Sequence, residues 1–151
     1  MTIWVDSREK ARAIKLILRD FDAAGIKYVT NKLPVGDYMS MDNARLVIDR
    51  KQSLLEICSN VVQDHDRFKR ELILAKNLGQ KVIILCEHGG KIRCLDDVIG
   101  WTNPRLSVSP LAVSGERLYR ILCQIKKTYG IEILFCEKKE TGSKIIELLG
   151  G

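Results

Sequence analysis

Residues 82–86 read Val-Ile-Ile-Leu-Cys, an unbroken apolar run near the middle of the chain. A strand with one wet face alternates apolar and polar residues, whereas a short run without alternation is typical of a strand covered on both faces. In α/β proteins helices commonly supply that cover. The run therefore predicts a buried strand in a sheet that has layers packed against both sides.

Amphipathic helices and further strands surround this run. Ile14, Ile17, Leu18 and Phe21 follow the i, i+3, i+4 and i+7 spacing of one helical face, and Gly25 supplies a stop. Strands are predicted at 3–5, 26–29, 36–39, 46–51, 82–86 and 131–136, and helices at 14–24, 53–62, 66–79, 95–99, 118–130 and 141–149. The strands at 36–39 and 46–51 are close enough in sequence to form an antiparallel hairpin. This order predicts an α/β sandwich around a mixed sheet.

The composition indicates one globular domain. With 151 residues, of which 46% are hydrophobic, the chain can bury a core without disulfides or a structural metal. Its five cysteines are an odd number without a C-x-x-C pair, which suits a reducing cytoplasm and no zinc site. We expect no signal peptide, no membrane segment and a cytoplasmic location. The formal net charge of +6 suits a polyanionic partner such as DNA, although many basic proteins bind none.

The segment Ile48-Asp49-Arg50-Lys51 carries the most chemical information. Side chains alternate along a strand, so Asp49 and Lys51 point to one side and Arg50 to the other. A carboxylate can hold a hard divalent cation, and a neighbouring ammonium can orient water or offset charge that develops on a phosphate. The pattern therefore suggests a site for phosphodiester hydrolysis.

Asp37 and Asp6 are the candidates for further metal ligands. Asp37 lies on the partner strand of the hairpin beside Gly36, whose missing side chain lets backbone or substrate come close. Asp6 follows the first strand, and strand ends in α/β sheets often border binding clefts. Each residue also fits an ordinary role, because Asp49 suits a surface ion pair, Asp37 a turn and Asp6 a helix N-cap.

Three segments together resemble the nuclease domain of the XPF family. They are Val-Asp-Ser-Arg-Glu at 5–9, Leu-Pro-Val-Gly-Asp-Tyr at 33–38 and Ile-Asp-Arg-Lys at 48–51. The family carries a D-x-R-E opening, a G-D pair and an E-R-K triplet followed by an aspartate. Residues 66–71 are similar to the family's R-F helix, and the resemblance extends from about residue 3 to 149.

The resemblance implies a restriction-endonuclease-like three-layer sandwich of the PD-(D/E)xK superfamily, with a central mixed sheet flanked by helices. It implies an endonuclease that uses Mg²⁺ or Mn²⁺ to cut branched or flap DNA near junctions of single and double strands. The implied catalytic residues are Asp6, Asp37, Asp49 and Lys51, of which the three aspartates bind metal. The implied DNA-binding or supporting residues are Arg8, Glu9, Arg50 and Arg67.

The chain departs from the family pattern at three points. Asp49 stands where the family has glutamate, which shortens the arm of that ligand by one methylene. The acid that the family carries after the lysine, with three residues between them, falls on Leu55, and Glu56 follows one residue late as the capping-box partner of Ser53. No helix-hairpin-helix module follows, so residues 1–151 are expected to form a single nuclease domain, as in free-standing phage or bacterial forms.

Two other roles remain open. The chain could be a non-catalytic DNA-binding or dimerisation module of the same fold, although decayed copies lose the acids or the lysine that persist here. The last two helices are apolar enough to form a homodimer interface as well as to pack on the sheet. Their apolar residues are Leu118, Ile121, Leu122, Ile125, Ile145, Ile146, Leu148 and Leu149.

Overall fold

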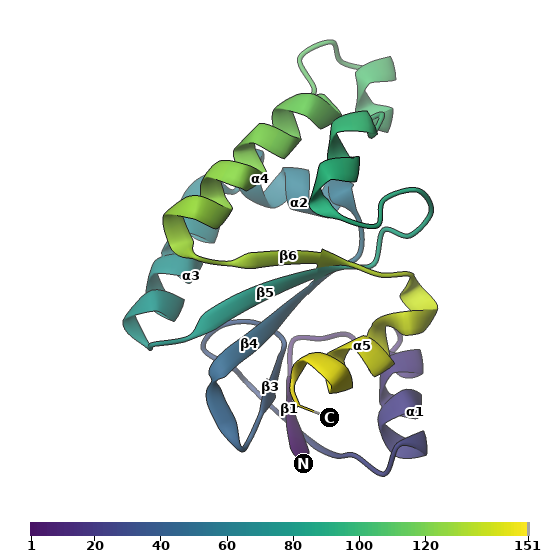
Figure 1. Ribbon diagram of the computed structural model, residues 1–151, viewed down its shortest axis with the longest axis vertical. Helices are drawn as coiled ribbons and strands as arrows, with labels where there is room; N and C mark the ends of the chain where they lie inside the picture. Colours follow the sequence, from purple (N-terminus) through teal and green to yellow (C-terminus); the bar gives the residue numbers. More distant parts are fainter. Residues whose placement is uncertain (151) are drawn as a thin grey trace.

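A computed structural model describes residues 1–150 of the chain, with one sheet at its centre (Figure 1). The strands are β1 (Thr2–Asp6), β2 (Lys27–Asn31), β3 (Tyr38–Ser40), β4 (Asn43–Lys51), β5 (Lys81–Cys86) and β6 (Glu132–Phe135). The α-helices are α1 (Lys15–Ala23), α2 (Leu54–Cys58), α3 (His65–Asn77), α4 (Gly115–Tyr129) and α5 (Thr141–Leu148). A π-helical turn, Ser59–Gln63, links α2 to α3, and 3₁₀ turns occupy Leu95–Gly100, Pro104–Ser107 and Lys138–Glu140. The elements predicted from the sequence are therefore confirmed, with boundaries shifted by a few residues.

The sheet is mixed, as predicted, with the strand order β2-β1-β3-β4-β5-β6. β3 and β4 form the expected antiparallel hairpin, and β3 also pairs antiparallel with β1. β1 pairs parallel with β2. β4 pairs parallel with β5, and β5 pairs parallel with β6. β4 thus lies inside the sheet, where the hairpin and the parallel strands meet.

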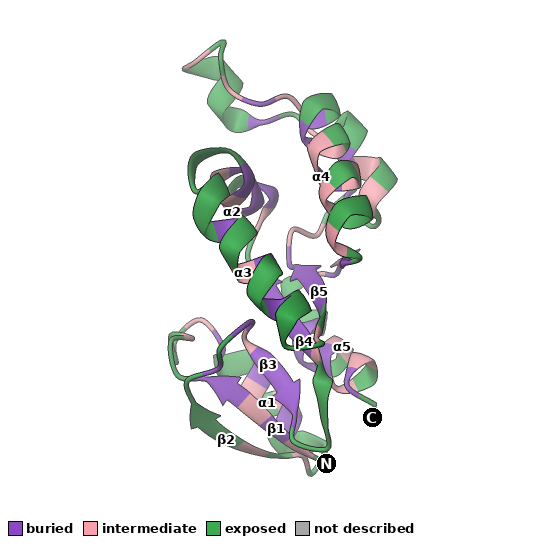
Figure 2. Cartoon of the chain, turned by 90° about the vertical axis from the view of Figure 1, so that its left-hand side faces the viewer, coloured by how far each residue is buried: buried purple, intermediate pink, exposed green. Residues whose placement is uncertain are grey.

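Helices cover the sheet on both faces, which confirms the three-layer α/β sandwich. One core lies under α2, α3 and α4 and includes Val47, Ile84 and Leu118. The other lies under α1 and α5 and includes Ile48, Ile83 and Ile145. Figure 2 shows buried residues concentrated on the strands and exposed residues on the outer side of α3. The apolar run at 82–86 is buried throughout, because helices from both layers pack against β5.

Local signals set the ends of the helices that border β4. The Ser53 side chain accepts a hydrogen bond from the Glu56 backbone N–H at 3.3 Å and caps α2. The Glu56 carboxylate returns to the backbone N–H of Gln52, at 2.9 Å, instead of that of Ser53. The predicted capping-box role of Glu56 is therefore met one residue earlier than the pattern suggests.

The apolar residues of the last two helices are used within the chain. Leu118 and Leu122 of α4 are fully buried on one face of the sheet, and Ile145 of α5 is fully buried on the other. These residues therefore cannot share one interface with a second copy. Among the described residues, none of the helices combines the length and apolar character that crossing a membrane requires.

Candidate active site

The C-terminal end of β4 sends neighbouring side chains to opposite layers. The Lys51 ammonium lies 3.4 Å from a carboxylate oxygen of Asp49, and both are largely buried. Arg50, between them, turns towards the other face of the sheet. The alternation predicted from the sequence is thus confirmed, because side chains two apart on a strand share a face.

Asp37 adds a second carboxylate to Asp49 and Lys51. Its backbone N–H donates to the Ile48 carbonyl at 2.8 Å, and its carboxylate accepts a hydrogen bond of 2.7 Å from the Arg50 backbone N–H. Burial raises the pKa of Asp37 well above its ordinary value, and the nearby charge of Asp49 raises it further. Two carboxylates held this close repel each other when both are ionised, which is the electrostatic condition that a bound cation relieves.

Lys51 remains a cation in this setting. Burial alone would lower the pKa of Lys51, but the negative charges of Asp49, Glu56 and Asp37 outweigh that effect and raise it. A cleft of about 250 Å³ opens over these groups and is also bordered by Arg8 and Glu9. The cleft therefore brings Asp37, Asp49 and Lys51 together and has room for a phosphate group.

The donor set suits magnesium or manganese better than zinc. Within residues 1–150 no three histidine, cysteine, aspartate or glutamate side chains converge as a ready-made metal site. Magnesium commonly binds through one or two carboxylates and completes its shell with water and substrate phosphate. Asp37 and Asp49 fit that pattern, and a phosphodiester in the cleft would supply further oxygens.

Asp6 does not join the other two carboxylates, contrary to the expectation of three aspartates around one ion. Its carboxylate accepts hydrogen bonds from the Arg8 side chain, at 2.8 and 3.2 Å, and from the Leu33 backbone N–H at 2.8 Å. Asp6 is 1% exposed, so these partners enclose it. The pair with Asp6 holds Arg8 at the edge of the cleft, where Arg8 also donates to the Leu33 carbonyl at 2.9 Å.

Arg50 forms a buried ionic network on the opposite face of β4. Its guanidinium donates to Glu9 at 2.8 Å and to Glu87 at 2.6 Å. The Thr141 hydroxyl, at the start of α5, donates to the second oxygen of Glu87 at 2.6 Å. Arg50 and Glu9 were both expected to support the site or contact DNA, and both side chains are largely buried within this network.

Glu71 is a functional candidate that the sequence reading missed. It lies on α3 with its carboxylate 3.5 Å from the Gly36 backbone N–H, and burial together with the charge of Asp49 raises its pKa. Phe68, Glu71, Leu72 and Ala75 follow the spacing of one buried helical face, so an acid inside an apolar stripe was the available signal. Glu71 therefore approaches the cleft from the helical layer.

Arg67 lies in the same region as Glu71. Both border a small cavity of about 140 Å³ that also reaches Lys51. Arg67 is exposed, whereas Arg50 is buried. Of the four residues expected to bind DNA or support the site, Arg8 and Arg67 are accessible.

Gly36 shapes the approach to Asp37. Its φ is +75°, and a Cβ atom built there would lie 3.1 Å from the Ile48 carbonyl oxygen. We expect Gly36→Ala to destabilise the fold by about 1–2 kcal/mol, because an L side chain is strained at this φ and meets the backbone of β4. Urea unfolding measures the change, and Gly25→Ala, also at positive φ but in open space, serves as the control. Equal losses in the two variants would show that contact with β4 contributes nothing.

Comparisons with known proteins agree with this architecture. The sequence model of the ERCC4 domain matches residues 5–149. XPF from Aeropyrum pernix has a TM-score of 0.70 at 20% identity, over 99% of this chain and 63% of that chain. The complex of XPF from Aeropyrum pernix with DNA gives 0.68 at 19% identity, over 98% of this chain and 62% of that chain. The chain thus spans less than two thirds of these proteins, and no curated protein sequence matches it significantly.

Proposed function

The chain belongs to the ERCC4 domain family, and from this premise we propose that it is a Mg²⁺- or Mn²⁺-dependent endonuclease that cuts DNA near branched or flap junctions. The single observation that carries the proposal is the cluster of Asp37, Asp49 and Lys51 in one cleft. A non-catalytic module would have no need to hold two ionisable carboxylates in a buried and mutually repulsive arrangement.

Each residue of the cleft has a distinct role in this proposal. Asp37 and Asp49 would hold the cation, which would supply polarisation of the scissile phosphate and a lowered pKa of bound water. Lys51 orients the attacking water and offsets the charge that develops on the phosphate, since its ammonium is fixed beside Asp49 at 3.4 Å. Arg8, held by Asp6, and Arg67 contact the DNA backbone from the two sides of the cleft.

The formal net charge of +6 supports DNA as the partner, because basic side chains near phosphates release condensed counterions. The neighbour from Aeropyrum pernix that was solved with DNA makes the same partner reasonable for this fold. A single nuclease domain without a helix-hairpin-helix module, a cytoplasmic location in a bacterial or phage-infected cell and a possible homodimer stay predictions.

Cleavage of labelled DNA tests the function directly. We expect splayed-arm or flap DNA to be cut within a few nucleotides of the junction in Mg²⁺ or Mn²⁺, because the cleft needs a cation between two carboxylates. EDTA should abolish the products, and a fully paired duplex of the same sequence should be cut far more slowly. A folded protein that cuts none of these substrates with either metal would leave the non-catalytic DNA-binding module as the better description.

A further inference from the structure

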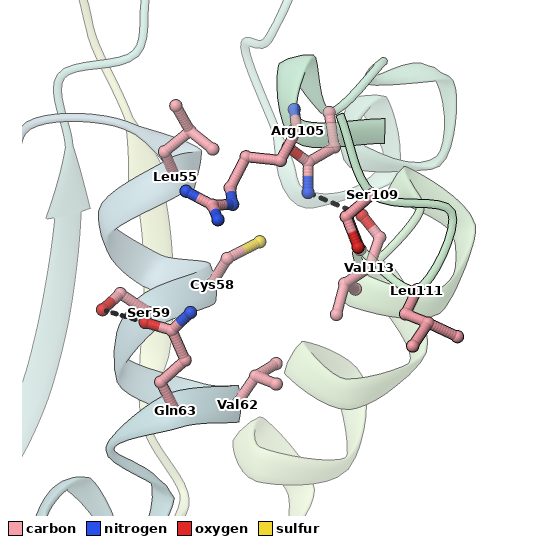
Figure 3. A pocket seen from close by; sticks show the side chains of 11 residues that line it. Leu55, Cys58, Ser59, Val62, Gln63, Arg105, Ser109, Leu111 and Val113 are labelled. Atoms are coloured by element: carbon pink, nitrogen blue, oxygen red, sulfur yellow. Dashed lines mark hydrogen bonds between the residues drawn. The ribbon is translucent and has the colours of Figure 1, made fainter. Parts of the chain in front are cut away.

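A second hollow lies beside α2 and is lined by residues other than those of the candidate active site (Figure 3). It is a groove of about 410 Å³ between the helical segment 55–63 and the segment 103–113. Its walls mix apolar and polar side chains, and the apolar ones include Leu55, Val62 and Leu111, of which Leu111 is 88% exposed. Contiguous exposed apolar surface of this kind commonly marks a binding site.

A cation reaches into this apolar groove. Figure 3 shows the Arg105 side chain extending from the 103–113 segment towards the helix that carries Leu55 and Cys58. Within the described part of the chain Arg105 forms no ion pair, and the residues lining the groove include no acid. The groove therefore offers an unpaired guanidinium to an anionic occupant.

Hydrogen bonds within the segment 103–113 hold the wall of the groove that carries Arg105. Asn103 is 3% exposed, and its side chain donates to the Val113 carbonyl at 2.8 Å and accepts from the Arg105 backbone N–H at 3.0 Å. These bonds tie the two ends of the segment together and fix the backbone from which Arg105 extends. A side chain that extends from a fixed backbone loses less entropy on binding than one on a mobile loop.

The groove and the candidate active site are bordered by neighbouring residues of α2. Glu56 borders the cleft that contains Asp37, Asp49 and Lys51, and the preceding residue, Leu55, borders the groove. An occupant of the groove would thus contact the same short helix that borders the proposed site of cleavage.

We infer that this groove receives an unpaired nucleotide of the DNA strand that leaves the junction, an inference that rests on the proposed function. The apolar side chains of the lining contact the base, and Arg105 pairs with its phosphate or packs on its face. The volume suits a ligand of nucleotide size, whereas a duplex is too wide to enter. The groove would therefore give the enzyme its preference for DNA with an unpaired strand.

DNA binding in EDTA tests the inference without any cleavage. Fluorescence anisotropy compares wild type, Arg105→Ala and Leu111→Asp on a splayed-arm DNA and on a duplex of equal length. We expect each variant to bind the splayed-arm DNA about tenfold more weakly and the duplex less than twofold more weakly. Arg45→Ala is the matched control, because Arg45 is an exposed arginine at the opposite end of β4.

Three results would overturn the inference. The first is that Arg105→Ala binds splayed-arm DNA as tightly as wild type. The second is that Arg105→Ala loses as much affinity for the duplex as for splayed-arm DNA, which would indicate a general contact with the DNA backbone. The third is a groove that serves a second copy of the chain, in which case Leu111→Asp would change the mass measured by light scattering instead of DNA affinity. Failure of cleavage alone would count against the proposed enzyme but leave Arg105-dependent binding intact.

Photocrosslinking locates the occupant independently. A 5-iodouracil placed at the first unpaired position beside the junction should crosslink to peptides from 55–63 or 105–113, and the same base inside the duplex should not. Crosslinks confined to other surfaces would also contradict the inference.

Discussion

Asp37→Asn is expected to reduce the rate of cleavage about 100-fold to 1,000-fold. The same change is expected to make the metal-free protein more stable at neutral pH. Asparagine keeps the shape of the side chain and can still accept the hydrogen bond from the Arg50 backbone N–H. It removes one of the two negative charges that hold the cation, so activity falls. It also removes a buried charge that Asp49 repels, so the fold gains stability.

The pH dependence of this gain follows from the direction of the pKa shift. Burial and the charge of Asp49 raise the pKa of Asp37 in the folded state, so folding favours its protonated form. The stability that Asp37 contributes is present below its unfolded pKa, about 3.9, and is lost as pH rises through the raised folded value. The variant should therefore match wild type near pH 3 and exceed it increasingly towards pH 7.

A cation should reverse the ranking of the two proteins. Mn²⁺ at about 100 times its dissociation constant would stabilise wild type by about 2.7 kcal/mol and leave Asp37→Asn nearly unchanged. Thermal unfolding with and without Mn²⁺ measures this, with Asp42→Asn in the exposed turn of the same hairpin as control. A Mn²⁺-induced shift that persists in Asp37→Asn would remove Asp37 from the metal site.

Arg50→Ala is expected to destabilise the fold by about 3–5 kcal/mol, the largest effect that we predict for a single change. The substitution leaves Glu9 and Glu87 buried without their cation, and both side chains are less than a tenth exposed. The loss reflects the cost of uncompensated buried charge rather than the strength of the ion pairs themselves. Urea unfolding at constant pH measures it.

Two further variants separate this mechanism from a simple packing defect. Lys81→Ala removes an exposed ion pair with Glu132, so it should cost less than about 1 kcal/mol. Adding Glu9→Gln and Glu87→Gln to Arg50→Ala should restore part of the lost stability, since neutral amides are less costly to bury than carboxylates. If the two glutamine substitutions restore no stability, the destabilisation by Arg50→Ala comes from the missing volume of the arginine side chain.

Local periodicity made the fold and much of the candidate site predictable. The alternation along residues 48–51 placed Asp49 and Lys51 together, and the short hairpin brought Asp37 beside them. Both inferences need only strand geometry and sequence proximity. The apolar run at 82–86 needed only its lack of alternation to predict burial on both faces.

The sequence alone did not predict which polar side chains pair with groups far away along the chain. Asp6 stands at the expected strand end, but its carboxylate is taken by Arg8 and by the Leu33 backbone, 27 residues further along the chain. Glu71 and Glu87 reach their places through the docking of α3 and the pairing of β5 with β4. A single sequence predicts the face of the sheet or helix on which a side chain lies. It does not predict which of several polar groups will form a hydrogen bond or ion pair with that side chain.

The alternation along β4 gives the chain an unusual sensitivity to insertion and deletion. Asp49 and Lys51 serve the cleft while Arg50, between them, ties the sheet to α5 through Glu87 and Thr141. Removing one residue upstream in β4 would exchange these destinations, sending the guanidinium into the cleft and the side chains of Asp49 and Lys51 into the buried layer that holds Glu9 and Glu87. Deletion of codons along residues 43–48 would therefore give results that depend on whether one or two residues are removed. Single deletions, which reverse the alternation, are expected to abolish folding and activity together.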